Sequence, residues 1–338
     1  MSTGAAVTVA GRPAGGPAGR LAGRSARRRR RGPAHTPWPV VALFVSPFVV
    51  GLLLFGLYPI GATVYYSFTD FRSGSYRPVH VVGWSNYVDL MTSSDAFWVS
   101  VRNTLWMVVV LVPLRTGFAL FAAWVLARMR RGAAVYRTIF FVPSMVPVVA
   151  SALSFIVMLN PGGPVNSLLA HVGVTGPGWF TDPGWAKPSL VLMAMWACGD
   201  TMVIFSAAML DVPRDLLEAA ELDGAGAGRR FWHVTLPALR PVLLFSTLTG
   251  VIYTFQYFTE AFVASGSANG LNSGNQSLGY PQQSLLFYTT DIYRQGFVYF
   301  KTGYASAEAV LLFLVIFAAT LVFLRVFGAI TPDPERSA

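Results

Sequence analysis

Arg115, Asp200 and Glu260 are ionisable side chains that fall within long apolar stretches of this 338-residue chain. Charged groups are costly in hydrocarbon, so such residues are candidates for a functional site. Arg115 and Asp200 carry opposite charges and could pair across a helical bundle, either on a substrate path or as a structural ion pair. A shallow position, with the charged end reaching the membrane surface, is the other open interpretation.

Residues 254–260, which read TFQYFTE, add hydroxyl, amide, aromatic and carboxyl groups within another apolar stretch. Sugars are bound by aromatic faces stacked on the ring and by polar groups that bond their hydroxyls. On a continuous helix, about 100° per residue places Tyr257 on one face with Thr254 or Glu260, and Gln256 elsewhere. We therefore expect Thr254, Tyr257 and Glu260 to line a substrate path. Contact with a neighbouring helix is the alternative.

No catalytic constellation accompanies these groups. The chain has no phosphate-binding G-x-x-x-x-G-K-[ST] loop, because its only Lys before Ser or Thr is Lys301, which follows Phe300. The four histidines are far apart, with no H-E-x-x-H. The single cysteine, Cys198, excludes an internal disulfide and argues against a cysteine metal site. We expect neither an enzyme nor a metal site, and a membrane enzyme is the least favoured class.

A charged, glycine-punctuated stretch, residues 218–237, lies between two apolar segments and reads EAAELDGAGAGRRFWHVTLP. A chain that only turns around at a membrane needs no such loop, whereas a chain that docks a soluble partner does. Pro213 suits a first helical position and Gly224 a helix stop. Residues 231–236 then begin a second short helix, which Pro237 closes. The pattern predicts two helices joined by a glycine turn, with small alanines that let a partner approach.

The composition requires a membrane. Hydrophobic residues make up 54% of the chain and charged residues 12%, against about 25% charged in ordinary soluble domains. Six apolar stretches can each cross a hydrocarbon core of about 30 Å. We expect an all-α integral membrane protein with six transmembrane helices, near residues 40–65, 103–127, 136–159, 189–210, 242–264 and 305–327.

The two ends of the chain differ from the rest. Residues 1–36 are rich in Ala, Gly, Pro and Arg without apolar periodicity, which predicts a disordered tail. Their basic run, residues 27–31, directly precedes the first apolar stretch. This position is typical of a topology signal that also meets anionic lipid, and we expect no nucleic-acid partner. The transmembrane domain is expected over residues 37–330, with a C-terminal tail over 331–338.

Lys and Arg are divided unevenly among the segments between the spans. Eighteen lie in the tail, residues 128–137, residues 211–241 and the C-terminal end, against five in the alternate loops. Because basic residues mark the cytoplasmic side, both termini and residues 211–241 are expected in the cytoplasm. Residues 67–96, 160–188 and 265–303 would then lie outside, where they could dock an extracytoplasmic partner or serve as simple connectors.

Residues 218–237 resemble the EAA signature, E-A-A-x3-G-x9-I-x-L-P, of permease subunits of ATP-driven (ABC) importers. Every spacing fits, with Val234 in place of Ile. The resemblance implies that residues 211–241, here named the coupling loop, sit in a groove of an ATP-binding subunit and transmit its closure to the membrane helices. It assigns this role to Glu218, Ala219, Ala220, Asp223, Gly224, Leu236 and Pro237.

Further motifs along residues 40–328 resemble the carbohydrate-type permeases of the maltose and glycerol-phosphate importers. They are VGWSNY at 82–87, YRTIFFVP at 136–143, an Asn-Pro pair at 160–161 followed by Asn166, and YASA at 304–307. The chain departs from the family near Gly199, where many relatives carry a proline–aromatic pair, and at 266–270, where relatives carry Gly-Gly-Pro. The sequence therefore does not decide whether the fourth span has the helix break and the pocket of the family.

The resemblance implies a type I ABC importer permease fold in the plasma (inner) membrane, which moves a mono- or oligosaccharide by alternating access. The implied partners are two ABC ATPase subunits, a second, homologous permease, an extracytoplasmic sugar-binding protein and membrane lipid. The chain itself would bind no cofactor, since ATP and Mg belong on the ATPase subunits. A polyol or glycerol-phosphate-like solute is the alternative substrate. An ion-coupled secondary transporter would explain Asp200 and Glu260 but not the coupling loop.

Overall fold

The computed structural model describes residues 38–129, 131–268 and 278–328. Over these residues the secondary structure is helical, and the one strand-like pairing within them is an isolated bridge between Thr69 and Val81. The expected tails, residues 1–36 and 331–338, lie outside the described residues. An all-α architecture is confirmed.

The chain divides into two units, Met1–Leu54 and Phe55–Ala338. In the first unit, α1 (Trp38–Gly51) is apolar on every side and has no buried residue. Such a helix is suited to surroundings of lipid. It continues into η1 (Leu52–Leu57), a π-helical turn within which the first unit ends.

The expected six spans correspond to the long apolar helices. Five of the helical stretches are each long and apolar enough to cross a membrane. A pair of helices that meet at an angle of 47°, Pro183–Trp196 and Gly199–Leu210, makes a sixth when the two are taken as one span. The other five stretches are Trp38–Ser67, Asp95–Ala127, Val148–His171, Arg240–Gly266 and Thr302–Val326.

The second and third spans differ from expectation at their starts. α4 (Asp95–Ala127) begins eight residues before the expected Asn103, because the Ser94 hydroxyl caps it by accepting a hydrogen bond from the Phe97 N–H at 3.2 Å. The expected span 136–159 is not one helix. It is divided into α5 (Ala133–Phe141), the 3-10 turn η2 (Val142–Met145) and α6 (Val148–Leu159), which α7 (Pro164–His171) follows.

Prolines cause the break in the third span. Pro143 has no N–H to continue the helix, and Val146, which precedes Pro147, is extended with ψ 132°. The residue before a proline is kept out of the helical region, so the chain turns between α5 and α6. This turn frees backbone groups in the middle of the apolar segment.

The fourth span is broken although it lacks the family's proline–aromatic pair. α8 (Pro183–Trp196) and α9 (Gly199–Leu210) meet at Ala197 and Cys198. A Cβ atom on Gly199 would lie 2.0 Å from the carbonyl oxygen of Phe140. Only glycine therefore lets the end of α5 approach the start of α9 this closely.

The fifth span is also interrupted. α13 (Arg240–Phe255) ends at Gln256, and α14 (Thr259–Ala268) begins three residues later. The sixth span, α16 (Thr302–Gly328), is continuous and matches the expected 305–327 within three residues. Shorter helices complete the second unit: α2 (Tyr58–Ser67), α3 (Ser85–Ser93), α10 (Arg214–Leu222), α11 (Ala227–Arg230), η3 (Phe231–Thr235), α12 (Leu236–Ala238), α15 (Tyr288–Tyr293) and η4 (Arg294–Val298).

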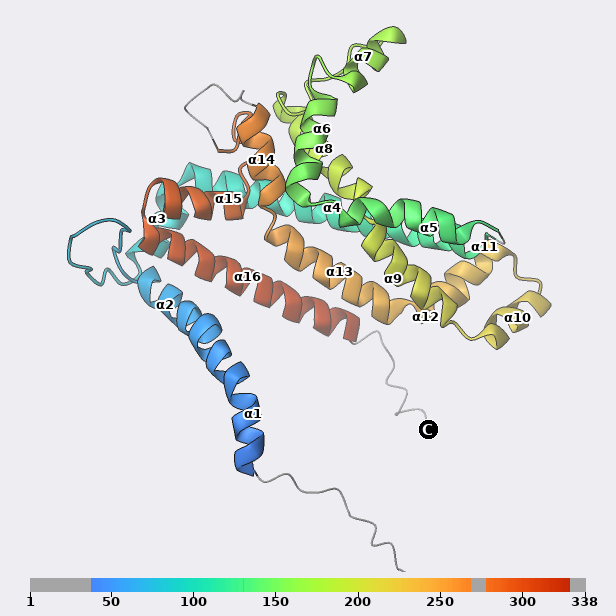
Figure 1. Cartoon of the computed structure of the whole chain (residues 1–338), viewed down its shortest axis with the longest axis horizontal. Coiled ribbons are helices and arrows are strands. Elements are labelled where there is room, and N and C mark those ends of the chain that lie inside the picture. Colours follow the sequence, from blue (N-terminus) through green and yellow to red (C-terminus); the bar gives the residue numbers. More distant parts are fainter. Residues whose placement is uncertain (1–37, 130, 269–277, 329–338) are drawn as a thin grey trace, which may run out of the picture. The chain divides into compact units, whose positions relative to one another are not determined.

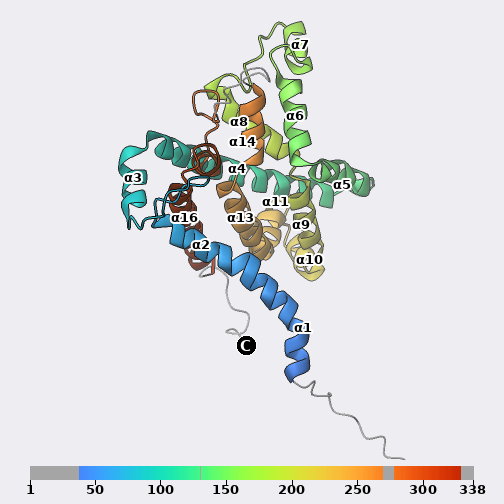
Figure 2. The same cartoon turned by 60° about the vertical axis from the view of Figure 1, so that its left-hand side comes forward.

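Within the second unit, α4 is the central element. It packs against α8, α9, α13 and α15, while α16 packs against α2 and α13, and α14 packs against α6 (Figures 1 and 2). The buried cluster around Met107 and Leu190 joins α4 to α8, and a second cluster around Ala123 and Phe205 joins α4 to α9.

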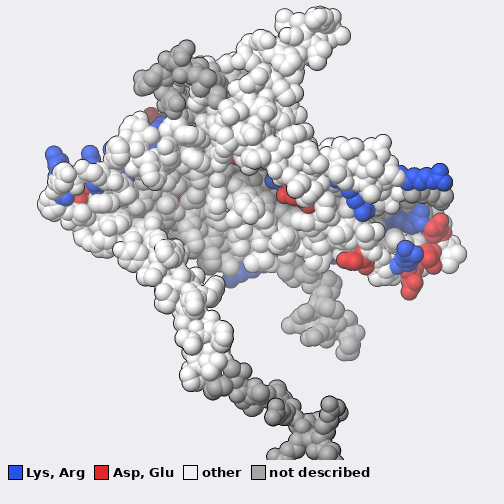
Figure 3. Space-filling view, in the orientation of Figure 1, with Lys and Arg blue, Asp and Glu red and all other residues white. Residues whose placement is uncertain are grey.

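Charged side chains gather at two ends of this unit. On the face in Figure 3 they cover α10 and α11 at one end and the segment between α2 and α3 at the other, with a largely uncharged surface between. Exposed apolar side chains on the helices between these ends, such as Val109, Phe121 and Phe317, are suited to lipid or to a second membrane subunit.

Gly199→Ala should destabilise the protein by about 1–3 kcal/mol, because the added methyl would overlap backbone atoms of Phe140 and Phe141 that cannot rotate away. Thermal unfolding in mild detergent measures the effect. Gly117→Ala in α4 is the matched control, since its Cβ has no neighbour within 4 Å. Equal melting temperatures for the two variants would contradict the close contact of α5 and α9.

Candidate functional site

The structure brings all five expected path residues to one cavity of about 360 Å³ in the second unit, here named the central cavity. Arg115 comes from α4, Asp200 from α9, Thr254 from α13, Tyr257 from the α13–α14 break and Glu260 from α14. With Ser144 and Val146 of the third span, the cavity therefore lies where three interrupted spans meet the longest helix. The other lining residues are Leu111, Ser144, Val146, Val148, Ser151, Met193, Ala194, Ala197, Tyr253, Gln256, Phe258 and Thr259.

The expected pairing of Arg115 with Asp200 is confirmed. The Arg115 Nη2 atom lies 2.9 Å from Asp200 Oδ1 and 3.1 Å from Oδ2. The same nitrogen is 3.4 Å from the carbonyl oxygen of Ala197, which lies at the α8–α9 break. The side chains are 32% and 52% exposed, so this ion pair faces the cavity.

The helical-wheel argument for residues 254–260 is wrong in one respect. Gln256 lines the cavity together with Thr254 and Tyr257, although a continuous helix would place it on another face. The helix stops at Phe255, where the N–H of Gln256 bonds the carbonyls of Tyr253 and Thr254. The break ends the regular rotation per residue, and neither Pro nor Gly marks it in the sequence.

Tyr257 offers an unused polar group. Its side chain is 8% exposed and packs edge-on against Phe287, with ring centroids 5.5 Å apart. Its hydroxyl has no hydrogen-bond partner among the described residues. A buried hydroxyl of this kind needs a water molecule or a ligand. By contrast, the Thr254 hydroxyl donates to the carbonyl of Gly250 at 2.8 Å, so it is left only as an acceptor.

Sequence reasoning missed Gln256, Ser144 and Ser151 as cavity residues. Ser144 belongs to η2, where its hydroxyl donates to the carbonyl of Phe141 at 2.6 Å. Both serines were read as parts of one continuous third span. Pro143 and Pro147 were the available signal, because they break the helix and turn these serines toward the cavity.

The coupling loop forms the expected first helix and glycine turn. α10 ends at Leu222, and Gly224 has φ +75°, a conformation that favours glycine. The N–H groups of Asp223 and Ala225 bond the carbonyls of Ala219 and Ala220 at 3.0 and 2.9 Å and close the helix end. Glu218 and Ala219 are exposed and Ala220 is half-buried.

The second helix of the loop begins and ends differently from the prediction. It starts at Ala227 in α11 rather than at residue 231, and it continues through η3 into α12. Pro237 does not close it, because Pro237 lies in the first turn of α12, where a missing N–H is tolerated. Leu236 and Pro237 are half-buried.

Two contacts fix the coupling loop. Arg230 forms an ion pair with Glu221 at 2.5 Å, which ties α11 to α10. The ring of Phe231 lies 5.3 Å from the ring of Trp124 near the end of α4, and the Arg128 guanidinium lies 4.0 Å over that same Trp124 ring. The loop is therefore attached through an aromatic contact to the helix that also carries Arg115.

Polar contacts also hold the segment before α16. Asn103 of α4 donates to the carbonyls of Gln283 and Leu286 at 2.8 and 2.9 Å. Outside the spans, Asp291 and Arg294 form an ion pair at 2.5 Å, with Asp291 only 1% exposed. Burial raises the pKa of Asp291, and the Arg294 charge opposes that rise.

A family model described as "Binding-protein-dependent transport system inner membrane component" matches residues 115–331. Among relatives, the probable ABC transporter permease protein YesP of Bacillus subtilis is 34% identical over 83% of this chain and 88% of its own. The lactose transport system permease protein LacF of Rhizobium radiobacter is 32% identical over 85% and 93%.

The fold also matches a solved structure. A bacterial ABC transporter involved in the import of the acidic polysaccharide alginate superposes with a TM-score of 0.74 at 20% identity, over 87% of this chain and 96% of that chain. The interrupted spans, the EAA loop and these likenesses agree. The chain belongs to the family of binding-protein-dependent transport system inner membrane components, the permease subunits of ABC transporters.

Proposed function

We propose that this chain translocates a sugar, a mono- or oligosaccharide, which an extracytoplasmic binding protein delivers. The central cavity carries the proposal, because it combines an unused tyrosine hydroxyl, an amide and carboxyl groups with aromatic rings. These are the groups that bind polyhydroxylated ligands. The names of two relatives support the substrate class, since they describe lactose and arabinooligosaccharide transport.

The charge balance of the cavity favours a neutral sugar over a phosphorylated solute. A phosphate needs a free cation, and Arg115 is the one cationic side chain in the cavity lining. Its guanidinium is already paired with Asp200, and Glu260 adds a further carboxyl group. The half-cavity that this chain supplies therefore offers a phosphate little attraction.

The coupling loop docks on an ATPase subunit in this proposal. α10 exposes Leu216, Ala219 and Leu222 at intervals of three residues, and Leu222 is 90% exposed. An apolar stripe of this kind fits a groove in a partner protein. A push on α10 would pass through the Glu221–Arg230 ion pair and the Phe231–Trp124 contact into α4. Arg115 lies nine residues from Trp124, about 14 Å along the helix axis.

The remaining subunits and the topology complete the proposed transporter. Two ATPase subunits would bind ATP and Mg and perform hydrolysis, and a second, homologous permease would supply the other half of the cavity. Placing the coupling loop on the ATP side puts both termini in the cytoplasm, as the excess of Arg beside this loop and in the tail supports.

The function is tested by purifying the tagged chain from its native membrane in mild detergent and identifying the proteins that accompany it. We expect an ATP-binding subunit and a second permease, and uptake that requires ATP in reconstituted vesicles. Recovery of this chain alone, with uptake that follows a proton or sodium gradient, would instead support an ion-coupled secondary transporter.

Gly224→Arg and Glu218→Lys should each abolish sugar uptake while leaving membrane insertion intact. Arginine is disfavoured at φ +75°, and reversing the exposed Glu218 charge removes the polar contact to the ATPase. Uptake and membrane abundance are measured together. Gly228→Ala in α11 is the control, because its Cβ has open space. Full uptake by a well-expressed Gly224→Arg protein would refute the coupling assignment.

Arg115→Ala and Asp200→Ala should each lower the kcat/KM of sugar uptake by about tenfold, because each leaves the other charge unpaired in the cavity. The double variant should be impaired by less than the product of the two single effects, since contacting residues couple. Arg77→Ala, on an exposed loop, is the control. Independent effects of the two substitutions would mean that the ion pair does not act as a unit.

A further inference from the structure

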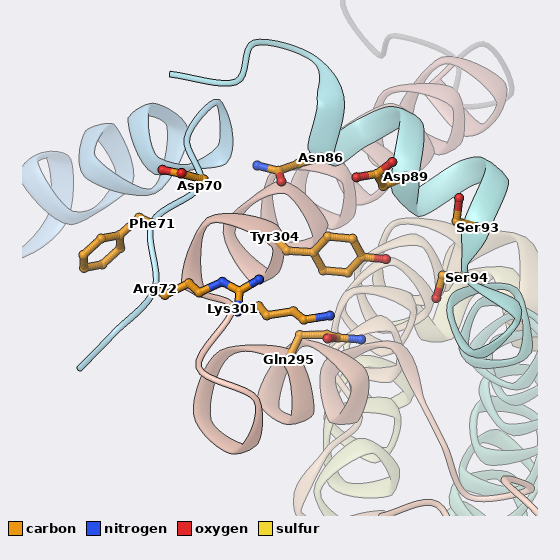
Figure 4. A pocket seen from close by; sticks show the side chains of 10 residues that line it. All are labelled: Asp70, Phe71, Arg72, Asn86, Asp89, Ser93, Ser94, Gln295, Lys301 and Tyr304. Atoms are coloured by element: carbon orange, nitrogen blue, oxygen red, sulfur yellow. The ribbon is translucent and has the colours of Figure 1, made fainter. Parts of the chain in front are cut away.

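A second cavity, of about 380 Å³, lies at the end of the second unit opposite α10 (Figures 1 and 4). Its wall comes from the segment after α2, from α3, and from the junction of η4 with α16. Under the proposed topology this is the outer end, and we name the site the outer cavity. Unlike the central cavity, it carries two basic side chains, Arg72 and Lys301.

The frame of the outer cavity is held by backbone contacts. Gly303 donates its N–H to the Phe71 carbonyl at 2.8 Å, and a Cβ on Gly303 would lie 2.2 Å from the carbonyl oxygen of Thr69. The N–H of Ser73 bonds the carbonyl of Phe300 at 3.2 Å. Asn86 of α3 donates to the carbonyl of Thr69 at 2.9 Å. Residues 69–73 are thereby fixed against the start of α16, so the wall is formed before any ligand arrives.

The two cations of the cavity are unpaired. Within the described ranges neither Arg72 nor Lys301 forms an ion pair, and both side chains are exposed. Figure 4 shows both side chains among those that line the cavity, together with Tyr304 and Gln295, and Lys301 Nζ lies 6.0 Å from the centroid of the Tyr304 ring. Cationic side chains without an ion-pair partner in a cavity wall attract an anion.

One polar atom in the wall of the cavity, Oε1 of Gln295, also lacks a hydrogen-bond partner among the described residues. Gln295 is 8% exposed, and its Oε1 atom accepts no hydrogen bond from the described residues. A buried amide oxygen without a donor is an unsatisfied polar group. The opposite wall carries the carboxylates Asp70 and Asp89, of which Asp70 accepts a hydrogen bond from the His80 N–H at 2.7 Å.

We propose that the outer cavity is a docking socket for an acidic side chain of the extracytoplasmic binding protein, whose carboxylate lies between Arg72 and Lys301. The inference rests on the proposed function, because that function supplies the partner. The inference adds the place where the binding protein contacts this chain and the chemistry of that contact.

The mixed charge of the socket favours a protein over a lipid headgroup. Asp70 and Asp89 face the same cavity as the two cations. They would repel a phosphate and the anionic surface around it, whereas a protein can place a basic or polar group against them. Contacts between exposed charges steer association and depend on salt, so the socket should act mainly on the association rate.

The test uses the complete transporter in lipid nanodiscs and its sugar-loaded binding protein. The double variant Arg72→Glu/Lys301→Glu should lower the association rate and raise the Kd by about tenfold at low salt, and the difference should shrink in 0.5 M salt, where the screening length is only a few ångströms. Arg77→Glu is the matched control. It is compared with the single variant Arg72→Glu, since both make the same charge change in the same loop, but Arg77 does not line the cavity. It should change the Kd by less than threefold.

A second measurement needs no substitution. The chain has only two lysines, Lys187 and Lys301. A carbodiimide activates carboxyl groups, and a lysine amine in contact with one displaces the urea and forms an amide bond. With the docked binding protein, we expect mass spectrometry to find an amide between Lys301 and an Asp or Glu of the binding protein, and none at Lys187, which contacts Asn103.

The outcomes separate this inference from the proposed function. An unchanged Kd in the double variant together with no cross-link at Lys301 would overturn the socket, while ATP-driven uptake would still support the permease. Loss of bound anionic lipid with an unchanged Kd would also overturn it, in favour of a lipid site. Uptake at saturating binding protein should stay near wild type, because the substitutions weaken docking and leave the central cavity intact.

Discussion

Backbone groups inside a membrane must find partners within the protein, because hydrocarbon offers none, and this constraint organises the second unit. Three spans are interrupted, around Val146, at Ala197–Cys198 and at residues 256–258, and all three interruptions border the central cavity. Side chains at the site repair the breaks. Arg115 donates to the carbonyl of Ala197, and the Ser144 hydroxyl donates to the carbonyl of Phe141. The residues that could meet a sugar are thus also residues that make irregular backbone tolerable there.

The long helix α4 joins the two ends of this arrangement. Near its C-terminal end it carries Trp124, against which the coupling loop rests through Phe231. In its middle it carries Arg115, and near its start Asn103 holds the carbonyls of the segment before α16. A single helix therefore touches the coupling loop, the central cavity and the opposite end of the second unit. Small residues such as Ala119 and Ala123 let α9 pack closely along it, so the two helices form one continuous surface.

Hydropathy predicted most of the long apolar helices, and motif spacing predicted the first helix and glycine turn of residues 211–241, because these depend on local composition or on a fixed pattern. The five residues expected on a substrate path all line the central cavity. The breaks were harder. Pro143 and Pro147 carried a signal that a continuous-span interpretation overrode, while the interruption after Phe255 has no Pro or Gly to mark it. The outer cavity could not be predicted at all. Arg72 and Lys301 are distant in sequence, and only the contact of residues 69–73 with Gly303 brings them together.

The helix α1 differs from the later helices in what keeps it stable in lipid. It is apolar on every side and has no buried residue. A segment of this kind is stable in lipid through its own hydropathy and its internal hydrogen bonds, without neighbours to complete it. Such a helix needs no ion pair with another helix to be stable in a bilayer. The later helices carry Arg115 and Asp200, whose charges are costly in hydrocarbon unless they pair, so the stability of α4 and α9 in lipid depends on their contact with each other.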